Sequence, residues 1–533
     1  MTKQILLIFC LCITVMLQAT VSKTVNVTAG GLSTALTFSE LTTVTDLTVT
    51  GTIDARDFVT MRDKAYDLTI INLSGANILA YNGTLGTSFE TSSTSYLANT
   101  IPEEAFDGNT SLASITLPLS VTSIGDWAFV NCTGLTTITF PSLVKSIGNY
   151  TFDGCKGLKG TLTIPSSVSY IGTEAFNSCT GLTSINYNAT NCIIGNSGGA
   201  FLGCSALKTL TIGANVTIIP NYIFEDCSGF TGTLNIPSSV LSIGDYAFGG
   251  CTGLTGTITI PMSVTSINAG AFQGCIGLTG ILTIPSSVTS IGIGAFSYCT
   301  GLTGTLTIPS SVTSINAGAF EGCTGLTSIT IPSSVTSIED YVFEGCIGLT
   351  SITIPSSIKS IGSEAFKSCT GLTGTLIIPS SVTSIASLAF SDCTGITRIV
   401  SESKTPAQCV STTFDGMNTN TCVLNVPVGT ALLYKNCTGW RDFFANIVET
   451  TTAISNITNA SINLYPNPIT ESFQISGLEG MGTITLSDLN GKIILLKQVF
   501  GNENISVGTL SKGIYILKII TNEGTIERKV VKK

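Results

Sequence analysis

The feature that most constrains this chain is a Phe-x-x-Cys pair that returns every 23 to 25 residues through its middle. The cysteines of the series are Cys132, Cys155, Cys179, Cys204, Cys227, Cys251, Cys275, Cys299, Cys323, Cys346, Cys369 and Cys393. Phe106 starts the series with Asn109 in the cysteine position, and Phe414 ends it with Met417 there. So small a unit cannot bury its own apolar side chains. The units must therefore stack, which predicts a solenoid of about 13 repeats.

Each unit contains a segment such as TLTIP, in which polar and apolar residues alternate. Alternation with a period of two is typical of a half-buried strand. Leu306 and Ile308 are therefore expected to face the core, and Thr305 and Thr307 to face the solvent. Pro309 ends the strand because it has no N–H for the ladder. The expected fold class is mainly β.

The segments between these strands are predicted to be turns. SSVTSI is expected to turn a corner and bury Val312 and Ile315, while NAGAF forms a tight or helical turn that carries Phe320 into the core. Units of 24 residues have an additional Gly before the strand, where a bulge can absorb it without shifting the inward-facing set. Asn109 is expected to use its amide to satisfy carbonyl groups of the inner turn.

The repeated motif C-x-x-L-T-S-I-T-I-P-S-S-V-T-S-I-G-x-x-A-F-x-x-C resembles the BspA-type leucine-rich repeat of bacterial surface proteins, and the resemblance covers residues 99–400. Residues 23–98, with LTVTGTIDARDFVTMRD and INLSGANI, resemble the N-terminal capping region of such proteins. Residues 401–448, with CVLNVPVGTALLYKNCTGW, resemble the closing cap. An open solenoid end would expose strand edges and core, so caps are required. By resemblance, such proteins serve in adhesion to host proteins, other bacteria or matrix.

The C-terminal part of the chain differs from the repeats. A polar linker at residues 449–463 precedes residues 464–533, which contain no Cys and show short alternating runs separated by turns, the pattern of a small antiparallel sandwich. The elements YPNP, DLNGK, GIYILK and KVVKK resemble the type A sorting domain of the type IX secretion system, an immunoglobulin-like sandwich. The resemblance implies contact with the secretion machinery through residues 464–533. It further implies export from a Bacteroidetes-type bacterium, removal of the tail, and release or attachment to the cell surface.

Residues 1–22 have the pattern of a secretory signal peptide. Lys3 precedes an apolar run from Ile5 to Leu17, and small residues follow near Ala19. The apolar run is too short to span a membrane, and no later segment reaches the roughly 18 apolar residues of a transmembrane helix. The mature chain is therefore expected to be exported without a transmembrane helix.

The composition excludes several classes of function. Charged residues make up 10% of the chain, the formal net charge is −9, and Lys and Arg do not cluster. A nucleic-acid partner is excluded because it needs many phosphate-neutralising cations. The chain contains no His, which removes His-based acid–base catalysis, Ser-His-Asp activation and His-ligated metal sites. We therefore predict no catalytic residue, no cofactor and no metal, and a protein that is not an enzyme.

The repeated cysteines could form a structural ladder, disulfides or a redox array, or a metal site. Stacking places equivalent sulfurs about 4.8 Å apart in a column, whereas zinc needs four donors that converge at about 2.3 Å. Parallel side chains also do not give the disulfide dihedral angle of about 90°. Structural filling is the favoured interpretation of the ladder, which includes Cys251, Cys275, Cys299 and Cys323. Outside the ladder, Cys409 and Cys422 are a possible disulfide in an exported protein.

The outward positions of the strands form a predicted column of threonines, broken by Asn235 and Ile377. The candidate ligand-binding residues in it are Thr259, Thr283, Thr305, Thr307, Thr330 and Thr353. We expect this face to bind an extracellular protein or glycan, as in an adhesin. One alternative is a structural surface or spacer protein without a specific ligand, which the near-identity of the units favours. A minor alternative is an ice-binding face, because T-x-T ladders line some antifreeze solenoids.

Overall fold

The computed structural model describes residues 20–89, 93–195, 198–450, 463–465, 468–476, 481–488, 492–500, 503–521 and 524–533. Most of the predicted signal peptide, and most of the predicted linker at 449–463, lies outside these described residues. The chain divides into two compact units. One contains the residues up to Thr397 together with Ala407–Thr419, and the other contains Arg398–Pro406 and Asn420–Lys533. Both units consist mainly of β-strands.

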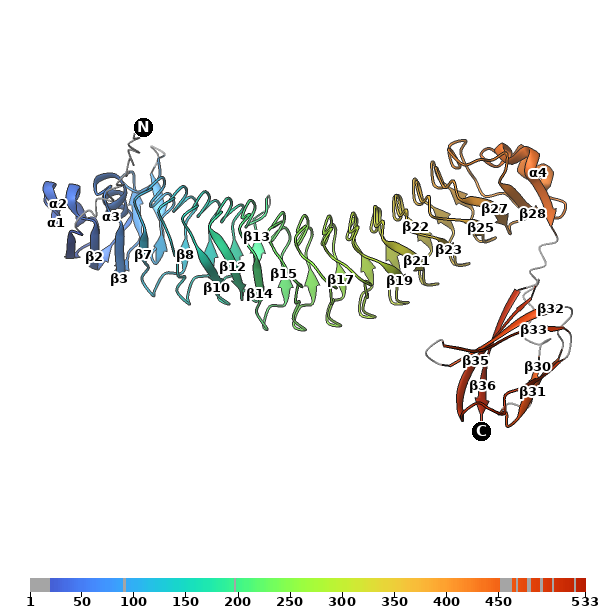
Figure 1. Cartoon of the computed structure of the whole chain (residues 1–533). Helices are drawn as coiled ribbons and strands as arrows, with labels where there is room; N and C mark the ends of the chain where they lie inside the picture. Colours follow the sequence, from blue (N-terminus) through green and yellow to red (C-terminus); the bar gives the residue numbers. More distant parts are fainter. Residues whose placement is uncertain are drawn as a thin grey trace, which may run out of the picture. The chain divides into compact units, whose positions relative to one another are not determined.

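The first unit begins with a parallel sheet of four strands in the order β1-β2-β3-β7 (Figure 1). The first three strands precede the repeats, whereas β7 belongs to the first repeat, and Ile71 pairs with Ile115 across that boundary. The predicted N-terminal cap and the repeats therefore share one sheet. The bounds of the elements in this region are β1 (Ser22–Val27), α1 (Leu32–Ala35), α2 (Phe38–Thr43), β2 (Asp46–Ile53), α3 (Ala55–Val59), the π-helical turn η1 (Thr60–Lys64), β3 (Ile70–Ile78), β4 (Tyr81–Gly83), β5 (Thr94–Tyr96) and β7 (Ser114–Thr116).

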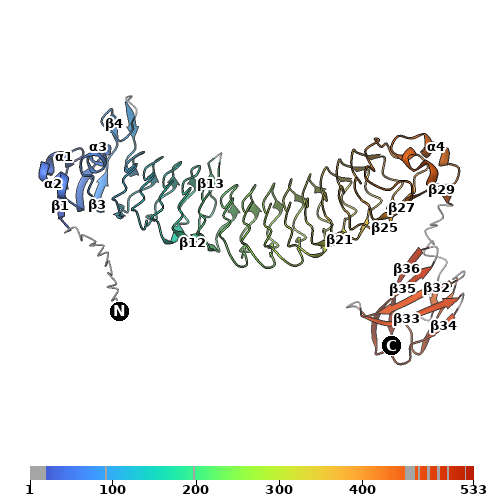
Figure 2. The same cartoon turned by 45° about the horizontal axis from the view of Figure 1, so that its top comes forward.

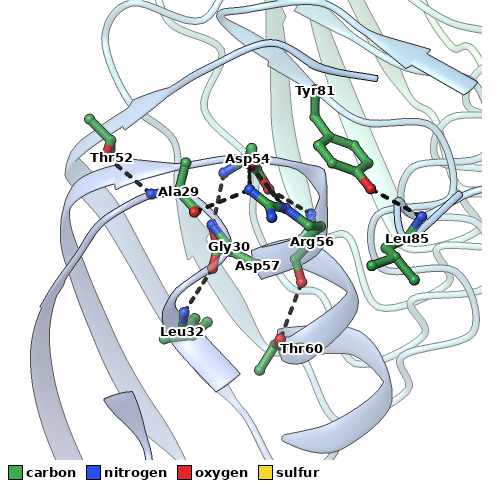
Figure 3. A network of polar contacts seen from close by, with 10 residues as sticks. All are labelled: Ala29, Gly30, Leu32, Thr52, Asp54, Arg56, Asp57, Thr60, Tyr81 and Leu85. Atoms are coloured by element: carbon green, nitrogen blue, oxygen red, sulfur yellow. Dashed lines mark hydrogen bonds and ion pairs between the residues drawn. The ribbon is translucent and has the colours of Figure 1, made fainter. Parts of the chain in front are cut away.

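A polar network ties the loop before α1 to the start of α3 (Figure 3). The fully buried carboxylate of Asp57 accepts hydrogen bonds of 2.7–2.9 Å from the backbone N–H groups of Gly30, Leu32 and Asp54. Arg56 forms an ion pair with Asp54 at 2.6 Å, and its guanidinium carbon lies 4.8 Å from the centre of the Tyr81 ring. This N-terminal region is therefore held together by specific charged residues.

Each repeat forms one coil, and the coils of the first unit stack side by side (Figures 1 and 2). The predicted TLTIP strands pair in parallel, in the orders β10-β12-β14 and β19-β21-β23. In the coils between these two sheets, single bridges such as Thr259 to Thr283 continue the pairing. The strands are β10 (Gly160–Ile164), β12 (Leu182–Tyr187), β14 (Thr209–Ile212), β19 (Gly304–Thr307), β21 (Leu326–Thr330), β23 (Ser351–Thr353) and β25 (Gly374–Ile378).

A second set of strands lies where the sequence predicts only a corner. Val312 and Ile315 are buried as expected, but Ser314 and Ile315 also form a strand that pairs with Ser290 and Ile291. The corner prediction was too coarse because two residues cannot show a period of two. The second set comprises β6 (Thr100–Ile101), β8 (Ser123–Ile124), β9 (Ser146–Ile147), β11 (Tyr170–Ile171), β13 (Ile193–Ile194), β15 (Ile218–Ile219), β16 (Ser242–Ile243), β17 (Ser266–Ile267), β18 (Ser290–Ile291), β20 (Ser314–Ile315), β22 (Ser337–Ile338), β24 (Ser360–Ile361) and β26 (Ser384–Ile385).

The third side of each coil is a turn that carries the Phe into the core. Its backbone bonds to the next coil, as where the N–H of Phe296 donates to the carbonyl of Ala319 at 2.9 Å. The Phe rings stack in a column from Phe106 to Phe414, with neighbouring ring centres 4.9–6.1 Å apart. The column runs through every repeat and forms the centre of a shared core.

The predicted bulge before the strand of 24-residue units is confirmed. The strand register shifts between Gly304 and Thr305, and again between Gly160 and Thr161. Gly304 has φ +78° and Gly160 has φ +72°, a region that residues with a side chain rarely occupy. The additional residue is absorbed at the Gly, and Leu306 and Ile308 stay buried.

The second unit contains two sets of elements. In residues 398–450, strands pair in parallel, and the hydroxyl of Tyr434 lies 2.7 Å from that of Ser401. In the tail, two antiparallel sheets have the orders β30-β31-β34 and β33-β32-β35-β36, with a core that includes Phe473, Leu486 and Leu517. This confirms the predicted sandwich.

The elements of this part are β27 (Ile396–Ser401), β28 (Val423–Pro427), α4 (Ala431–Asn436), the 3-10 helix η2 (Trp440–Asn446), β29 (Ile447–Thr450), β30 (Asn463–Tyr465), β31 (Ser472–Ser476), β32 (Met481–Ser487), β33 (Ile493–Phe500), β34 (Glu503–Ser506), β35 (Gly513–Thr521) and β36 (Gly524–Lys532). Among the described residues of both units, every helix is too short or too polar to cross a membrane.

Candidate binding face

The structure brings five of the six predicted threonines into one row. Thr259 bridges to Thr283 and Thr283 to Thr307, and the ladder then continues to Thr330 and Thr353. All five side chains are exposed. They stand on successive coils at the position two residues before the proline. We call this row, together with Thr305, the threonine face.

A second row runs through the sixth predicted residue, Thr305. It pairs with Ser328, and Ser328 pairs with Ser351. The hydroxyl oxygens of Thr305 and Ser328 are 2.7 Å apart, so they share a hydrogen bond. The two serines were not among the predicted residues. Counting four residues back from the proline of each unit would have found them.

The threonine face is exposed because the strand alternation places apolar side chains on its other side. Leu306 is completely buried and Ile308 is 2% exposed, while Thr305 and Thr307 between them are exposed. The inward and outward assignments made from the TLTIP pattern are therefore confirmed.

The surface is uncharged over its central coils. Residues 246–320 contain no Asp, Glu, Lys or Arg, and no Lys or Arg occurs between Lys208 and Lys359. An exposed apolar side chain, Ile281, lies two residues before Thr283 and is 56% exposed. A ligand at this face would meet hydroxyl groups and methyl groups rather than charges.

The cysteine ladder lies inside the coils and makes a repeated hydrogen bond. The sulfur of Cys299 donates to the carbonyl oxygen of Phe272 in the preceding coil at 3.0 Å, and Cys323 does the same to Phe296 at 3.1 Å. Cys251 and Cys275 repeat the pattern at 3.1 Å. Each Phe carbonyl also accepts the N–H of the cysteine in its own coil, which occupies both of its lone pairs.

Burial makes these thiols poor nucleophiles and poor metal ligands. It raises the pKa of the Cys299 and Cys346 thiols to about 12, and raises the pKa of Cys251, Cys275 and Cys323 well above the ordinary value. A protonated thiol neither attacks a disulfide nor binds zinc. No group of three or more His, Cys, Asp or Glu side chains in the described part of the chain could hold a metal ion. The geometry supports a structural role for the ladder.

Asn109 occupies the cysteine position of the first coil, and Cys409 and Cys422 lie outside the ladder. Asn109 does not satisfy carbonyl groups: its side-chain oxygen accepts from the backbone N–H groups of Ser111 and Leu112 at 3.2 and 3.0 Å. That expectation was wrong, because the side chain of Asn109 turns towards the backbone N–H groups of its own turn. Burial raises the pKa of the Cys422 thiol to about 11. Its disulfide with Cys409 stays a prediction.

Comparison with known proteins identifies both parts of the chain. Residues 99–231, 230–305 and 303–419 match the BspA type leucine rich repeat region in six copies. Residues 463–533 match the secretion system C-terminal sorting domain. Such a tail marks a secreted or cell-surface protein of a Bacteroidetes-type bacterium that interacts with the secretion machinery. No curated protein matches the chain.

A solved structure from another bacterium shows the same fold. A leucine-rich repeat protein from Bacteroides ovatus is 27% identical, with 67% of this chain and 88% of that chain covered and a TM-score of 0.54. A leucine rich cell surface protein from Faecalibacterium prausnitzii is 30% identical over 59% of this chain and 86% of that chain, with a TM-score of 0.37. The chain belongs to the BspA-type leucine-rich repeat family and carries a C-terminal sorting domain of the type IX secretion system.

Proposed function

We propose that the exported repeat region is a non-catalytic binding module, an adhesin, whose threonine face engages an extracellular protein or glycan. The observation that carries this proposal is the exposed row of threonines held in register over five coils. Coils about 4.8 Å apart place this row along a length of about 20 Å. The whole array of about 13 coils would extend about 60 Å, which is ample for a protein interface of standard size.

The chemistry of the face favours a ligand recognised by shape and hydroxyl contacts. Because the central coils lack charge, electrostatic steering should contribute little to binding. We expect the affinity to change little between about 50 and 500 mM salt, since only charged contacts are screened in that range. A collapse of binding over that range would contradict the proposed face.

The test is a pull-down with the full chain from host matrix and from co-resident bacteria. Thr307→Lys together with Thr330→Lys places charges in the middle of the face and should abolish capture. Thr300→Lys is the matched control, because Thr300 is also exposed but lies outside the strand. Capture that survives the double substitution would overturn the proposal.

A structural spacer is the second candidate, and the near-identity of the units from Cys251 to Cys323 supports it. A specific site should diversify its outward positions, whereas a spacer needs only stackable coils. The spacer predicts no capture above background by the unmodified chain. An ice-binding face is disfavoured by the mixed second row, where Ile281, Ser328 and Ser351 replace threonine. An assay showing no inhibition of ice recrystallisation would exclude it.

The export part of the proposal has its own experiment. Fractionation and intact-mass measurement of the full chain, beside a chain truncated after residue 463, should show the full chain outside the cell without its tail. The truncated chain should stay inside the outer membrane. Equal export of both chains would contradict the role given to residues 464–533.

A further inference from the structure

The four-stranded sheet of the tail has apolar side chains on its solvent side. An antiparallel sheet in a sandwich usually buries one face and turns polar residues to the solvent on the other. In this sheet Tyr515 is buried as expected, but Leu496 is 65% exposed, and Ile494 and Ile514 are each 38% exposed. With Ile493, which is 58% exposed, these three residues define what we call the apolar patch. Exposed apolar residues that gather in one place mark interaction sites.

The strand pairing places the four residues of the apolar patch at one end of the sheet. Ser487, on the central strand β32, pairs with Ile493 on one side and with Ile516 on the other. Ile514 precedes Ile516 by two residues on the same strand, towards the same end. The patch therefore combines the start of β33 with the start of β35.

The strand β33 forms the open edge of this sheet (Figure 1). Among the described strands of the tail, it pairs with β32 alone. The register shifts between Leu486 and Ser487, which leaves Ile494 as the additional residue of a β-bulge on β33. Bulges at sheet edges redirect side chains, and an edge with exposed apolar residues is prone to unwanted association. Such an edge requires an explanation in an exported protein.

Basic residues surround the apolar patch. Lys492 precedes β33, Lys512 precedes β35 and Lys533 follows β36, and all three side chains are exposed. The antiparallel order brings these three strand ends together. Asp488 also lies at this end, and its carboxylate accepts the backbone N–H of Lys492 at 3.0 Å. Residues 464–533 contain eight Lys and Arg against six Asp and Glu, whereas the whole chain has a net charge of −9.

We propose that the apolar patch is the surface through which the tail binds a protein of the secretion machinery, and that this partner presents an apolar surface rimmed by carboxylates. An apolar centre with a charged rim is the usual anatomy of a protein interface, and the lysines select an acidic partner. The inference rests on the proposed role of residues 464–533 in export. Removal of the tail after export would also remove the exposed edge from the mature protein.

Two other partners match the patch less well. A second copy of the chain would bring the lysines of two patches together, and like charges across an interface oppose association. An anionic membrane would attract both the lysines and the apolar residues. Residues 463–533 match a secretion system sorting domain, however, which favours a protein of that system as the partner.

The first experiment identifies the partner by photo-cross-linking in a bacterium with a type IX secretion system. The full chain carries p-benzoylphenylalanine in place of Leu496, and cross-linked products are identified by mass spectrometry. The matched control carries the same residue in place of Asn504, which is exposed on β34 in the other sheet. A protein of the secretion machinery should cross-link to position 496 and not to position 504. A cross-link to a second copy, a cross-link to lipid alone, or equal cross-linking from both positions would overturn the inference.

The second experiment measures export of full-chain variants. Ile493→Ser together with Leu496→Ser should lower the exported fraction about tenfold, the loss expected when the anchors of an interface are removed. Thermal unfolding of the purified variant should be unchanged, because both side chains are exposed. The control is Leu432→Ser together with Leu433→Ser, since these residues are 70% and 53% exposed but lie outside the tail.

The chain truncated after residue 463 separates this inference from the role of the tail as a whole. If the truncated chain is retained while the Ile493 and Leu496 double variant is exported normally, the apolar patch is not the binding surface and the role of the tail stands. If the truncated chain is itself exported, the role of the tail fails and the inference fails with it. Replacement of the three rim lysines should also reduce export, in a variant with Lys492→Glu, Lys512→Glu and Lys533→Glu, and unchanged export of this variant would contradict an acidic partner.

Discussion

The central coils and the N-terminal region provide hydrogen-bond partners for their polar groups in opposite ways. Residues 246–320 contain no charged side chain, and there repeated backbone and thiol groups bond to neighbouring coils, as Cys299 does to Phe272 of the preceding coil. The N-terminal region has no preceding coil. It uses Asp57, Arg56 and Arg62 to bond backbone groups that repetition would otherwise satisfy. Inside the array, hydrogen bonds between equivalent coils take the place of charged side chains. At the N-terminal end, charged side chains make the hydrogen bonds that a preceding coil would make.

The largest expected effect breaks the array and spares the N-terminal region, whose described residues before Cys132 contain no Cys. Burial raises the pKa of eleven ladder thiols, that of Cys299 from 9.0 to about 12. Below pH 9 these thiols are protonated in both states. Above it the unfolded chain ionises while the folded chain cannot, so stability should fall from pH 9 towards 12, by about 1.4 kcal/mol per thiol at pH 10.

Urea unfolding followed by circular dichroism between pH 8 and 10 measures this loss. A variant with Cys251, Cys275 and Cys299 all replaced by Ala is the control. Because it lacks three titrating thiols, its free energy of unfolding should fall less as the pH rises. An identical pH dependence in the two proteins would show that the ladder thiols do not titrate as their burial requires.

The next effect tests the aromatic column of the array. Phe296 stacks between Phe272 and Phe320 with ring centres 5.4 and 5.6 Å apart, and it is completely buried. Phe296→Ala should lower the free energy of unfolding by about 3–5 kcal/mol. Phe38→Ala in the N-terminal region should change it by less than about 0.5 kcal/mol, because Phe38 is exposed. Similar losses for both variants would remove the distinction between column and surface.

A smaller effect tests the charged end. Asp57→Asn replaces a carboxylate that accepts three backbone N–H groups with an amide whose NH₂ faces donors. The expected loss is about 1–3 kcal/mol in urea unfolding, the cost of an unsatisfied buried donor. Asp415→Asn, at an exposed position, is the control. If Asp57→Asn is neutral, specific charge is not what holds the N-terminal region.

The smallest effect concerns the hydrogen bond of one thiol. Cys299→Ala removes the donor to Phe272 and should cost about 1 kcal/mol, whereas Cys299→Ser keeps a donor in place and should cost less. Thermal unfolding of the two variants gives the comparison. A Ser variant as unstable as the Ala variant would mean that cysteine stabilises this position through the volume of its sulfur and not through the hydrogen bond to Phe272.

Much of the array was predictable because its signals are local and repeated. The period of the Phe-x-x-Cys pair gave the coils, the alternation at Leu306 and Thr307 gave the two sides of the strand, and the additional Gly304 gave the bulge. These features depend only on a residue's neighbours in its own coil or on the equivalent residue one coil away. The ordered row of threonines followed directly from the same register.

The features that could not be predicted depend on segments too short to show a pattern or on contacts between distant segments. The strand at Ser314 and Ile315 is too short for a pattern. The Asn109 side chain bonds to Ser111 and Leu112 of its own turn, which the cysteines at the equivalent position of later coils gave no reason to expect. The network of Asp57 joins it to Gly30 and Leu32, which are distant in the sequence, and only folding brings them together.

The glycine bulge has a consequence for how such a protein can evolve. Because Gly304 and its equivalents absorb one residue without moving the inward-facing set, coils of 23 and 24 residues are interchangeable neighbours. A gene duplication that copies one coil adds about 4.8 Å of reach and creates an interface that the protein already contains many times. Lineages of this family can therefore lengthen or shorten their arrays by recombination, while the specialised N-terminal end is inherited intact.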